Sequence, residues 1–150
     1  AALHLHGIRK LIIVNGHGGN SFKNMIRDLS VDFPDFLIAI TNWYGIVPQE
    51  GYFENKDDHA GELETSVMMY YHPELVNLEE AGEGASKPFA LSSLNAQIAW
   101  LPRYWSKVSA DTGIGDPRKS TPEKGERYAK AVIEKLALLF TEIGSKEVYL

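Results

Sequence analysis

Two short stretches of the sequence surround a histidine with residues whose types and spacing could do chemistry. In residues 15–20, NGHGGN, three glycines flank His17. Glycine lets the backbone take positive φ and approach a ligand closely, and an imidazole can bind a metal or transfer a proton near neutral pH. An ordinary histidine in a Gly-rich turn is the alternative for this stretch taken alone.

The second stretch, residues 57–66 (DDHAGELETS), places a histidine and carboxylates at the expected start of a helix. His59 and Glu62 are three residues apart and would share a helix face, as would Asp58 and Glu62 at a spacing of four. A histidine and a carboxylate on one face could serve as acid and base or bind a metal. The alternatives are a cap-region histidine held by Asp58 and a solvated Glu62.

The elements that must position these side chains begin with a predicted β-α-β unit. Apolar runs at 11–14 and 36–40 are joined by a helical pattern over 21–31. Such runs are typical of parallel strands with a right-handed crossover, and ligands bind beyond the carboxyl ends of such strands. Trp43 would therefore lie at the same edge as His17, although a core or rim aromatic is the alternative.

The rest of the chain predicts two further helices and long connections. A helix is expected from His59 to about residue 71, and another from about residue 120 to 142, where Ser120 and Glu123 form a capping box. Residues 75–94 have no strong period and are expected to form a surface connection. An aromatic cluster follows it and could be core or a subunit contact: Trp100, Tyr104 and Trp105.

Composition and charge exclude several classes of function. The net charge is −5 and the basic residues are scattered, so we expect no nucleic-acid partner and no binding to anionic membranes. No apolar run is long enough to span a membrane, and a cytoplasmic protein is expected. Because the chain has no Cys, a metal would have to be held by His and carboxylates, which suits zinc, manganese or iron.

Three motifs together resemble the creatininase family of metal-dependent amide hydrolases. They are NGHGGN, the H-x-G-x-x-E-T-S pattern that begins at His59, and GIGDPRKSTPEKG at 113–125. The resemblance covers nearly all of the chain. It implies an α/β fold of the creatininase type, three-layered (α/β/α), with a mostly parallel sheet.

The resemblance also implies an activity, namely hydrolysis of a small amide C–N bond by a metal-activated water. The substrate would be a small-molecule amide, either a cyclic amide or a formamide, and the cofactor a divalent metal (Zn, Mn or Fe) in a one- or two-metal site. A formamide hydrolase and a peptide-trimming member of the family both remain open. The alternative from another class is a non-catalytic scaffold or assembly subunit.

Residue roles follow from the same resemblance. His17 corresponds to a metal ligand and His59 to an acid/base or substrate-orienting residue. Glu62 has no acidic counterpart in creatininase but could act as a replacement ligand or as a base for a metal-bound water. Glu64 would orient the ligands or the His17 loop without binding the metal itself. Substrate contacts are expected at four positions: Gly18, Gly19, Asn20 and Trp43.

The sequence departs from creatininase at Gly18 and Gly19, where creatininase carries Tyr and Glu. This departure removes one substrate contact and one metal ligand, and it favours a family member with a different pocket.

We expect residues 1–150 to be the later part of a single creatininase-like domain. The family's E-x-H…D metal-binding segment has no counterpart in the sequence, and His4 and His6 precede the first strand and so lie at its wrong end. A missing N-terminal segment or a second chain is therefore expected to complete the metal site. The family's ring-like hexamers, together with the aromatic cluster, predict a homo-oligomer.

Overall fold

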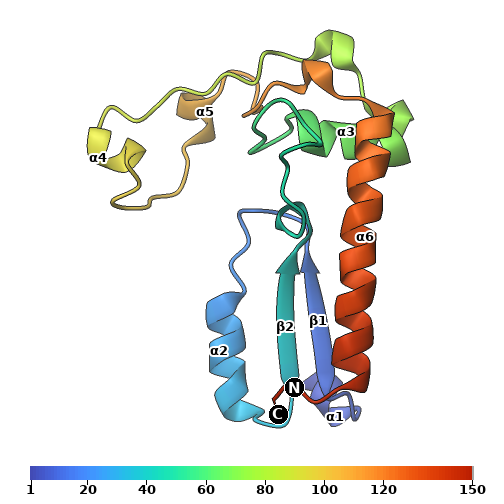
Figure 1. Cartoon of the computed structure of the whole chain (residues 1–150). Coiled ribbons are helices and arrows are strands. Elements are labelled where there is room, and N and C mark those ends of the chain that lie inside the picture. The colour runs from blue at the N-terminus through green and yellow to red at the C-terminus, as the bar shows by residue number, and fades with distance from the viewer. Residues whose placement is uncertain (150) are drawn as a thin grey trace. The chain divides into compact units, whose positions relative to one another are not determined.

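The computed structural model describes residues 1–149, and its helices and strands are shown in Figure 1. In chain order they are α1 (Ala2–Leu5), β1 (Lys10–Asn15), α2 (Lys23–Asp32), β2 (Leu37–Asn42), α3 (Glu62–Tyr71), α4 (Ser92–Asn95), α5 (Trp105–Val108) and α6 (Pro122–Ser145). Single turns of 3₁₀ helix lie at Trp43–Gly45, Pro73–Leu75, Leu78–Glu80 and Pro117–Lys119.

The chain divides into two compact units. The first contains residues 1–48 and the C-terminal part of the chain from Ala131, and the second contains residues 49–130. Helix α6 begins in the second unit and ends in the first.

The first unit contains the predicted β-α-β arrangement. Strands β1 and β2 pair in parallel, from Lys10 opposite Leu37 to Asn15 opposite Asn42, and α2 connects them. The prediction of an α/β fold with parallel strands is thus confirmed. Both strands end at one edge, which is where the sequence places its candidate residues.

The C-terminal half of α6 also packs in this unit, on the side of the strand pair opposite α2 in Figure 1. Lys10 Nζ donates to the carbonyl oxygens of Ile143 at 2.7 Å and Lys146 at 3.2 Å. A cation at the end of a helix satisfies carbonyls that have no partner within the helix. The start of β1 therefore anchors the end of α6.

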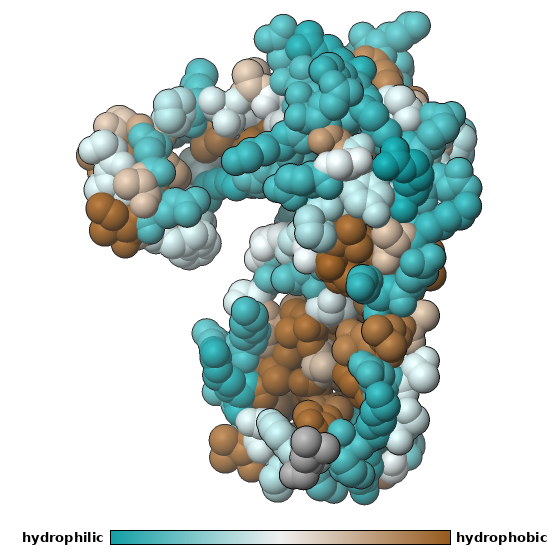
Figure 2. Space-filling view, viewed as in Figure 1, coloured by the Kyte–Doolittle hydropathy of each residue, from teal (hydrophilic) through white to brown (hydrophobic). Residues whose placement is uncertain are grey.

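One face of the strand pair remains apolar and accessible. Figure 2 shows hydrophobic side chains gathered over the strands, between polar side chains of the flanking helices. Within β1 only Asn15 is buried, and no residue of β2 is fully buried. Parallel strands are usually covered on both faces.

The core of the second unit forms where α3 meets the start of α6. Leu63 and Tyr128 are almost fully buried, and the rings of Tyr52 and Phe53 lie 5.4 and 5.2 Å from the Tyr128 ring. Burial raises the pKa of the Tyr128 hydroxyl to about 12.

Gly125 allows α3 and α6 to approach closely. A Cβ built at this position would lie 2.0 Å from the backbone oxygen of Ser66, so only glycine fits. The last glycine of the third motif therefore serves the packing of that motif against α3.

One expectation for the second unit needs correction, and one segment takes a form that the sequence left open. Helix α3 begins at Glu62 rather than at His59, and the aromatic segment at 98–108 forms only the short helix α5. Within residues 1–149, no helix combines the length and the apolar character needed to cross a membrane.

Candidate active site

The loop that carries His17 is built around the side chain of Asn15, the last residue of β1. Asn15 is only 3% exposed, although it is polar. Its Oδ1 accepts hydrogen bonds from the backbone N–H of His17 at 3.3 Å and from Asn20 Nδ2 at 2.9 Å. Its Nδ2 donates to the carbonyl of His17 at 2.9 Å. One buried amide thus fixes both ends of the loop.

Asn42 completes this arrangement from the neighbouring strand. Asn15 Nδ2 also donates to Asn42 Oδ1 at 2.9 Å, and the two residues are direct partners in the parallel register. The roles of Asn15 and Asn42 were not predicted from the sequence. The available signal was an asparagine as the last residue of each of the two strands.

The imidazole of His17 is exposed and lies over Gly19. A Cβ built at Gly19 would be 2.9 Å from His17 Nε2, so the observed ring position depends on the missing side chain. At Gly18 a Cβ would lie 3.7 Å from the hydroxyl of Tyr44. Gly19 therefore gives the imidazole the space that it occupies, whereas a Cβ at Gly18 would only make an ordinary contact with Tyr44.

A hollow of about 550 Å³ opens beside the strand ends. Its lining includes Asn20, Asn42 and Tyr44, together with the apolar residues Phe22, just before α2, and Ile40 of β2. Trp43 donates from Nε1 to the carbonyl of Gly16 at 3.4 Å, which ties it to the same loop. The predicted substrate positions Gly18, Gly19, Asn20 and Trp43 are thus all in the first unit, around this edge of the sheet.

His59 lies in a loop of the second unit, and two backbone hydrogen bonds of His59 hold this loop in place. Its N–H donates to the carbonyl of Ile114 at 2.9 Å, and its carbonyl accepts from the N–H of Ile114 at 2.8 Å. This short antiparallel bridge joins the second motif to the third. The His59 ring lies 4.9 Å from the ring of Trp105, and its Nδ1 lies 4.0 Å from Glu64 Oε2.

Asp57 and Glu64 explain why α3 starts after His59. Asp57 accepts from the N–H groups of Gly61 at 3.3 Å and Glu64 at 3.0 Å, and Glu64 accepts from the N–H of Ala60 at 2.7 Å. Ala60 has a φ of 52°, which is incompatible with a helix. The two carboxylates thus satisfy backbone N–H groups at and just before the helix start. Burial is the main reason why the pKa of Asp57 is raised.

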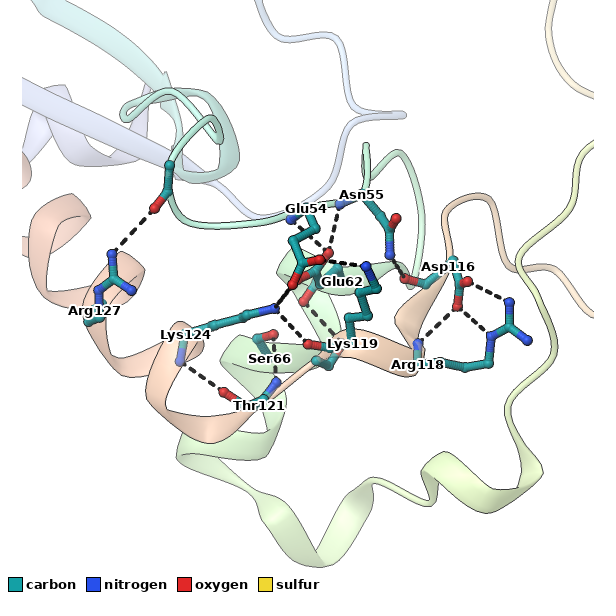
Figure 3. Close-up of polar contacts among 12 residues, drawn as sticks. Glu54, Asn55, Glu62, Ser66, Asp116, Arg118, Lys119, Thr121, Lys124 and Arg127 are labelled. Atoms are coloured by element: carbon teal, nitrogen blue, oxygen red, sulfur yellow. Dashed lines mark hydrogen bonds and ion pairs between the residues drawn. The ribbon is translucent and has the colours of Figure 1, made fainter.

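Glu62 is fully buried in a network of charge-assisted hydrogen bonds, drawn in Figure 3. Its Oε2 accepts from the N–H groups of Glu54 at 3.0 Å and Asn55 at 2.7 Å, and its Oε1 accepts from Lys124 Nζ at 2.5 Å. The hydrogen bond from Lys124 to Glu62 is the main cause of the raised pKa of Lys124. The assignment of Glu62 as metal ligand or base stays a prediction without geometric support, because protein donors occupy both of its oxygens.

The third motif docks on α3 through the residues around Lys124. Ser120 Oγ donates to the carbonyl of Glu62 at 3.2 Å, and the N–H of Thr121 donates to Ser66 Oγ at 3.2 Å. Asp116 accepts from the N–H and side chain of Arg118, and Arg118 lowers the pKa of Asp116 to about 2. The motif thus forms a capped turn that joins α6 to the second motif, as Figure 3 shows.

The two candidate histidines have different chemical surroundings and belong to different units. Within residues 1–149, no group of three or more His, Asp or Glu side chains is arranged to hold a metal ion. His17 fits the role of one ligand, since its imidazole is exposed at a strand end and its loop is hydrogen-bonded in place. Among the described residues, His17 is therefore a candidate metal ligand.

Comparison with known proteins shows one consistent likeness. The creatininase family profile, described as creatinine amidohydrolase, matches residues 1–140. A crystal structure of a candidate creatinine amidohydrolase from Bacteroides fragilis NCTC 9343 is 61% identical, with a TM-score of 0.95 over 99% of this chain and 59% of the other.

More distant relatives carry two different names. A mycofactocin precursor peptide peptidase from Mycobacterium tuberculosis is 30% identical over 84% of this chain and 45% of its own length. Creatinine amidohydrolase from Pseudomonas putida is 23% identical over 88% of this chain and 55% of its own length. The chain thus spans about half the length of the curated relatives that it matches. A mutant creatininase of the Zn-Zn type, 23% identical with a TM-score of 0.71 over 93% of this chain and 58% of its own, shares the fold.

Proposed function

Because this chain belongs to the creatininase family, we propose that it carries part of the active site of a hydrolase that cleaves a small amide C–N bond. The observation that carries the proposal is the His17 loop. There a buried asparagine fixes the backbone of His17, whose side chain is exposed just after the carboxyl end of a parallel strand. Asn20 of the same loop lines a hollow of about 550 Å³. Ligand sites of open α/β sheets occupy this position.

We assign the two histidines different roles. His17 would provide one ligand to a divalent metal, for which solved creatininases that contain zinc or manganese are the precedent. When bound, the metal supplies a water of lowered pKa. The remaining ligands would come from a further N-terminal segment or a second chain, as expected from the family motif.

His59 would donate the proton that the leaving nitrogen needs. Its Nδ1 faces Glu64, so the proton would come from Nε2, on the opposite side of the ring. A histidine suits this step because its charge changes near neutral pH. Glu64, fixed by the N–H of Ala60, would place a carboxylate 4.0 Å from Nδ1, where it favours the protonated ring.

The substrate is either a small cyclic amide or formamide, or a peptide. Gly18 and Gly19 replace the Tyr and Glu of creatininase, which supports a substrate other than creatinine. The peptide alternative is supported by relatives named mycofactocin precursor peptide peptidase, at 30% identity.

The test uses the purified full-length protein and measures whether it hydrolyses each of three probes. These are creatinine, an N-formyl amide and a short peptide. We expect one probe to be hydrolysed, the activity to be lost on chelation, and zinc, manganese or iron to restore it. His17→Ala should abolish both metal binding and activity. His72→Ala is the matched control, because His72 is an exposed histidine whose ring pairs with the exposed Glu74.

Two results would contradict the proposal. Activity that is indifferent to chelators would rule out the metal. Absence of both stoichiometric metal and hydrolysis, by elemental analysis and assay, would favour the non-catalytic scaffold.

We also propose that the protein assembles as a homo-oligomer, by family likeness a hexamer. Two large aromatic side chains of the segment between α4 and α5 support this, since Trp100 is 86% and Tyr104 66% exposed. Exposed aromatic side chains are enriched in subunit interfaces. Light scattering that gives a monomer mass at micromolar concentration would contradict it.

A further inference from the structure

The segment that leads into α5 is fixed to the His59 loop by two separate contacts. Arg103 Nη1 donates to Asp58 Oδ1 at 2.8 Å, and Arg103 Nη2 pairs with Asp58 Oδ2. Two residues further on, the Trp105 ring lies 4.9 Å from the His59 ring, with the planes inclined by 52°. Two nearby residues of one segment therefore contact two neighbouring residues of another.

The two contacts support each other. The Arg103 guanidinium lies over the Trp105 ring, 5.5 Å from its centre, while its nitrogens engage Asp58. A bidentate arginine–carboxylate pair has a defined geometry, and a cation over an indole adds a further attraction. Asp58 thus positions Arg103, and Arg103 restrains the indole that contacts His59.

This arrangement restricts the imidazole of His59. The bridge to Ile114 fixes its backbone, and Glu64 Oε2 lies 4.0 Å from Nδ1. The remaining freedom of the side chain is rotation about its χ angles, which a large ring packed against it restricts. Trp105 is the aromatic residue that supplies this contact in the second unit.

We propose that Trp105 is a positioning residue for His59, and that its indole keeps the imidazole in the orientation from which it delivers a proton. The inference rests on the proposed function, in which His59 is the proton donor. It separates Trp105 from Trp100 and Tyr104, with which the sequence grouped it, because those two are mostly exposed and Trp105 is only partly so.

The contact itself is tested by NMR on the full-length protein with labelled histidine, where His59→Gln identifies the His59 signals. An indole at this distance shifts the His59 ring protons through its ring current. Trp105→Ala should remove that shift, Trp105→Phe should keep part of it, and Trp100→Ala should leave it unchanged. Far-UV circular dichroism and a melting curve establish that each variant is folded.

The positioning role is tested by kinetics on whichever of the three probes is hydrolysed. Because a misplaced catalytic group costs about 10²-fold, Trp105→Ala should lower kcat by about that factor. KM should stay within about twofold, since substrate binding is not the step affected. Trp105→Phe should recover most of kcat, and the pH profile of Trp105→Ala should lose the limb assigned to His59.

The outcomes distinguish this inference from the proposed function. If Trp105→Ala leaves the His59 ring shifts unchanged, the contact is absent and the inference is wrong whatever the activity. If the shifts change but kcat and its pH profile do not, while His59→Gln lowers kcat, then His59 acts without Trp105. If His59→Gln has no effect, both the proton-donor role and the positioning role are wrong.

Discussion

The side chains of Asn15 and Asn42 are joined by a hydrogen bond of 2.9 Å across the ends of the two parallel strands. Asn15 makes this bond with the same nitrogen that donates to the carbonyl of His17. The position of the His17 loop is therefore determined by a buried amide and by the strand pairing that brings the two asparagines together.

Asn15→Ala should destabilise the fold and loosen the His17 loop. It leaves buried partners unpaired, which costs about 1–3 kcal/mol in the free energy of unfolding. Urea denaturation measures the loss in the free energy of unfolding. Faster hydrogen exchange at Gly18, Gly19 and Asn20 reports the loosening of the loop. Asn24→Ala is the control, because Asn24 is exposed on α2 and accepts from Arg27 there. Equal effects for the two variants would contradict the organising role of Asn15.

Gly19→Ala should move the His17 ring without unfolding the protein. The added Cβ would approach Nε2 to 2.9 Å, and the end of a flexible side chain can rotate away. We expect stability to change by less than about 0.5 kcal/mol, as for ordinary surface substitutions. The His17 contacts in NMR spectra should change nonetheless. Gly16→Ala is the control, since a Cβ there meets nothing within 4 Å. An unchanged ring position would contradict the prediction.

Gly125→Ala should be among the most damaging single substitutions in α6. The new Cβ would lie 2.0 Å from the backbone oxygen of Ser66, and the two helices would have to separate. We expect a loss of about 3 kcal/mol or more, or failure to fold. Gly144→Ala, on the same helix with open space around it, should instead stabilise by about 0.5–1 kcal/mol. Thermal denaturation of both variants measures the difference in their stabilities. Similar stabilities for the two variants would contradict the close packing of α3 and α6 at Gly125.

Lys124→Met should destabilise the second unit because it leaves the buried Glu62 carboxylate without its cation. Breaking a buried pair in this way costs about 3–5 kcal/mol. Lys130→Met removes an exposed pair with Glu126 and should cost less than about 1 kcal/mol. Urea denaturation of the two variants gives the comparison. A small effect of Lys124→Met would reopen Glu62 as a residue available for chemistry.

Asp116 should stabilise the fold in a pH-dependent way. Arg118 lowers the pKa of Asp116 from 3.8 to about 2, so the contribution is fully present above 3.8 and is lost as the pH falls toward 2. The stability difference between wild type and Asp116→Asn should therefore shrink over this interval. Glu83→Gln removes the other acidic partner of Arg118 and should leave most of the dependence in place. A difference that is constant with pH would show that the pair does not form.

Local sequence patterns predicted the elements well and the contacts between distant segments poorly. The apolar runs at 11–14 and 36–40 predicted both strands, because continuous apolar stretches of that length suit a buried strand. The start of α3 was misplaced by three residues, since the bonds of Asp57 and Glu64 to the loop are not visible in a helical period. The contacts of Glu62 with Lys124 and of His59 with Trp105 join residues far apart in the sequence, and no local pattern specifies them.

The discontinuous first unit has a consequence for the order of folding. Residues 1–48 emerge from the ribosome well before the part of α6 that Lys10 anchors, and the whole second unit lies between them in the sequence. Contacts between residues so far apart require closure of a long loop, which slows folding. We therefore expect the second unit to acquire its structure first during synthesis, and the strand pair to lack its contact with α6 until the chain reaches Ile143.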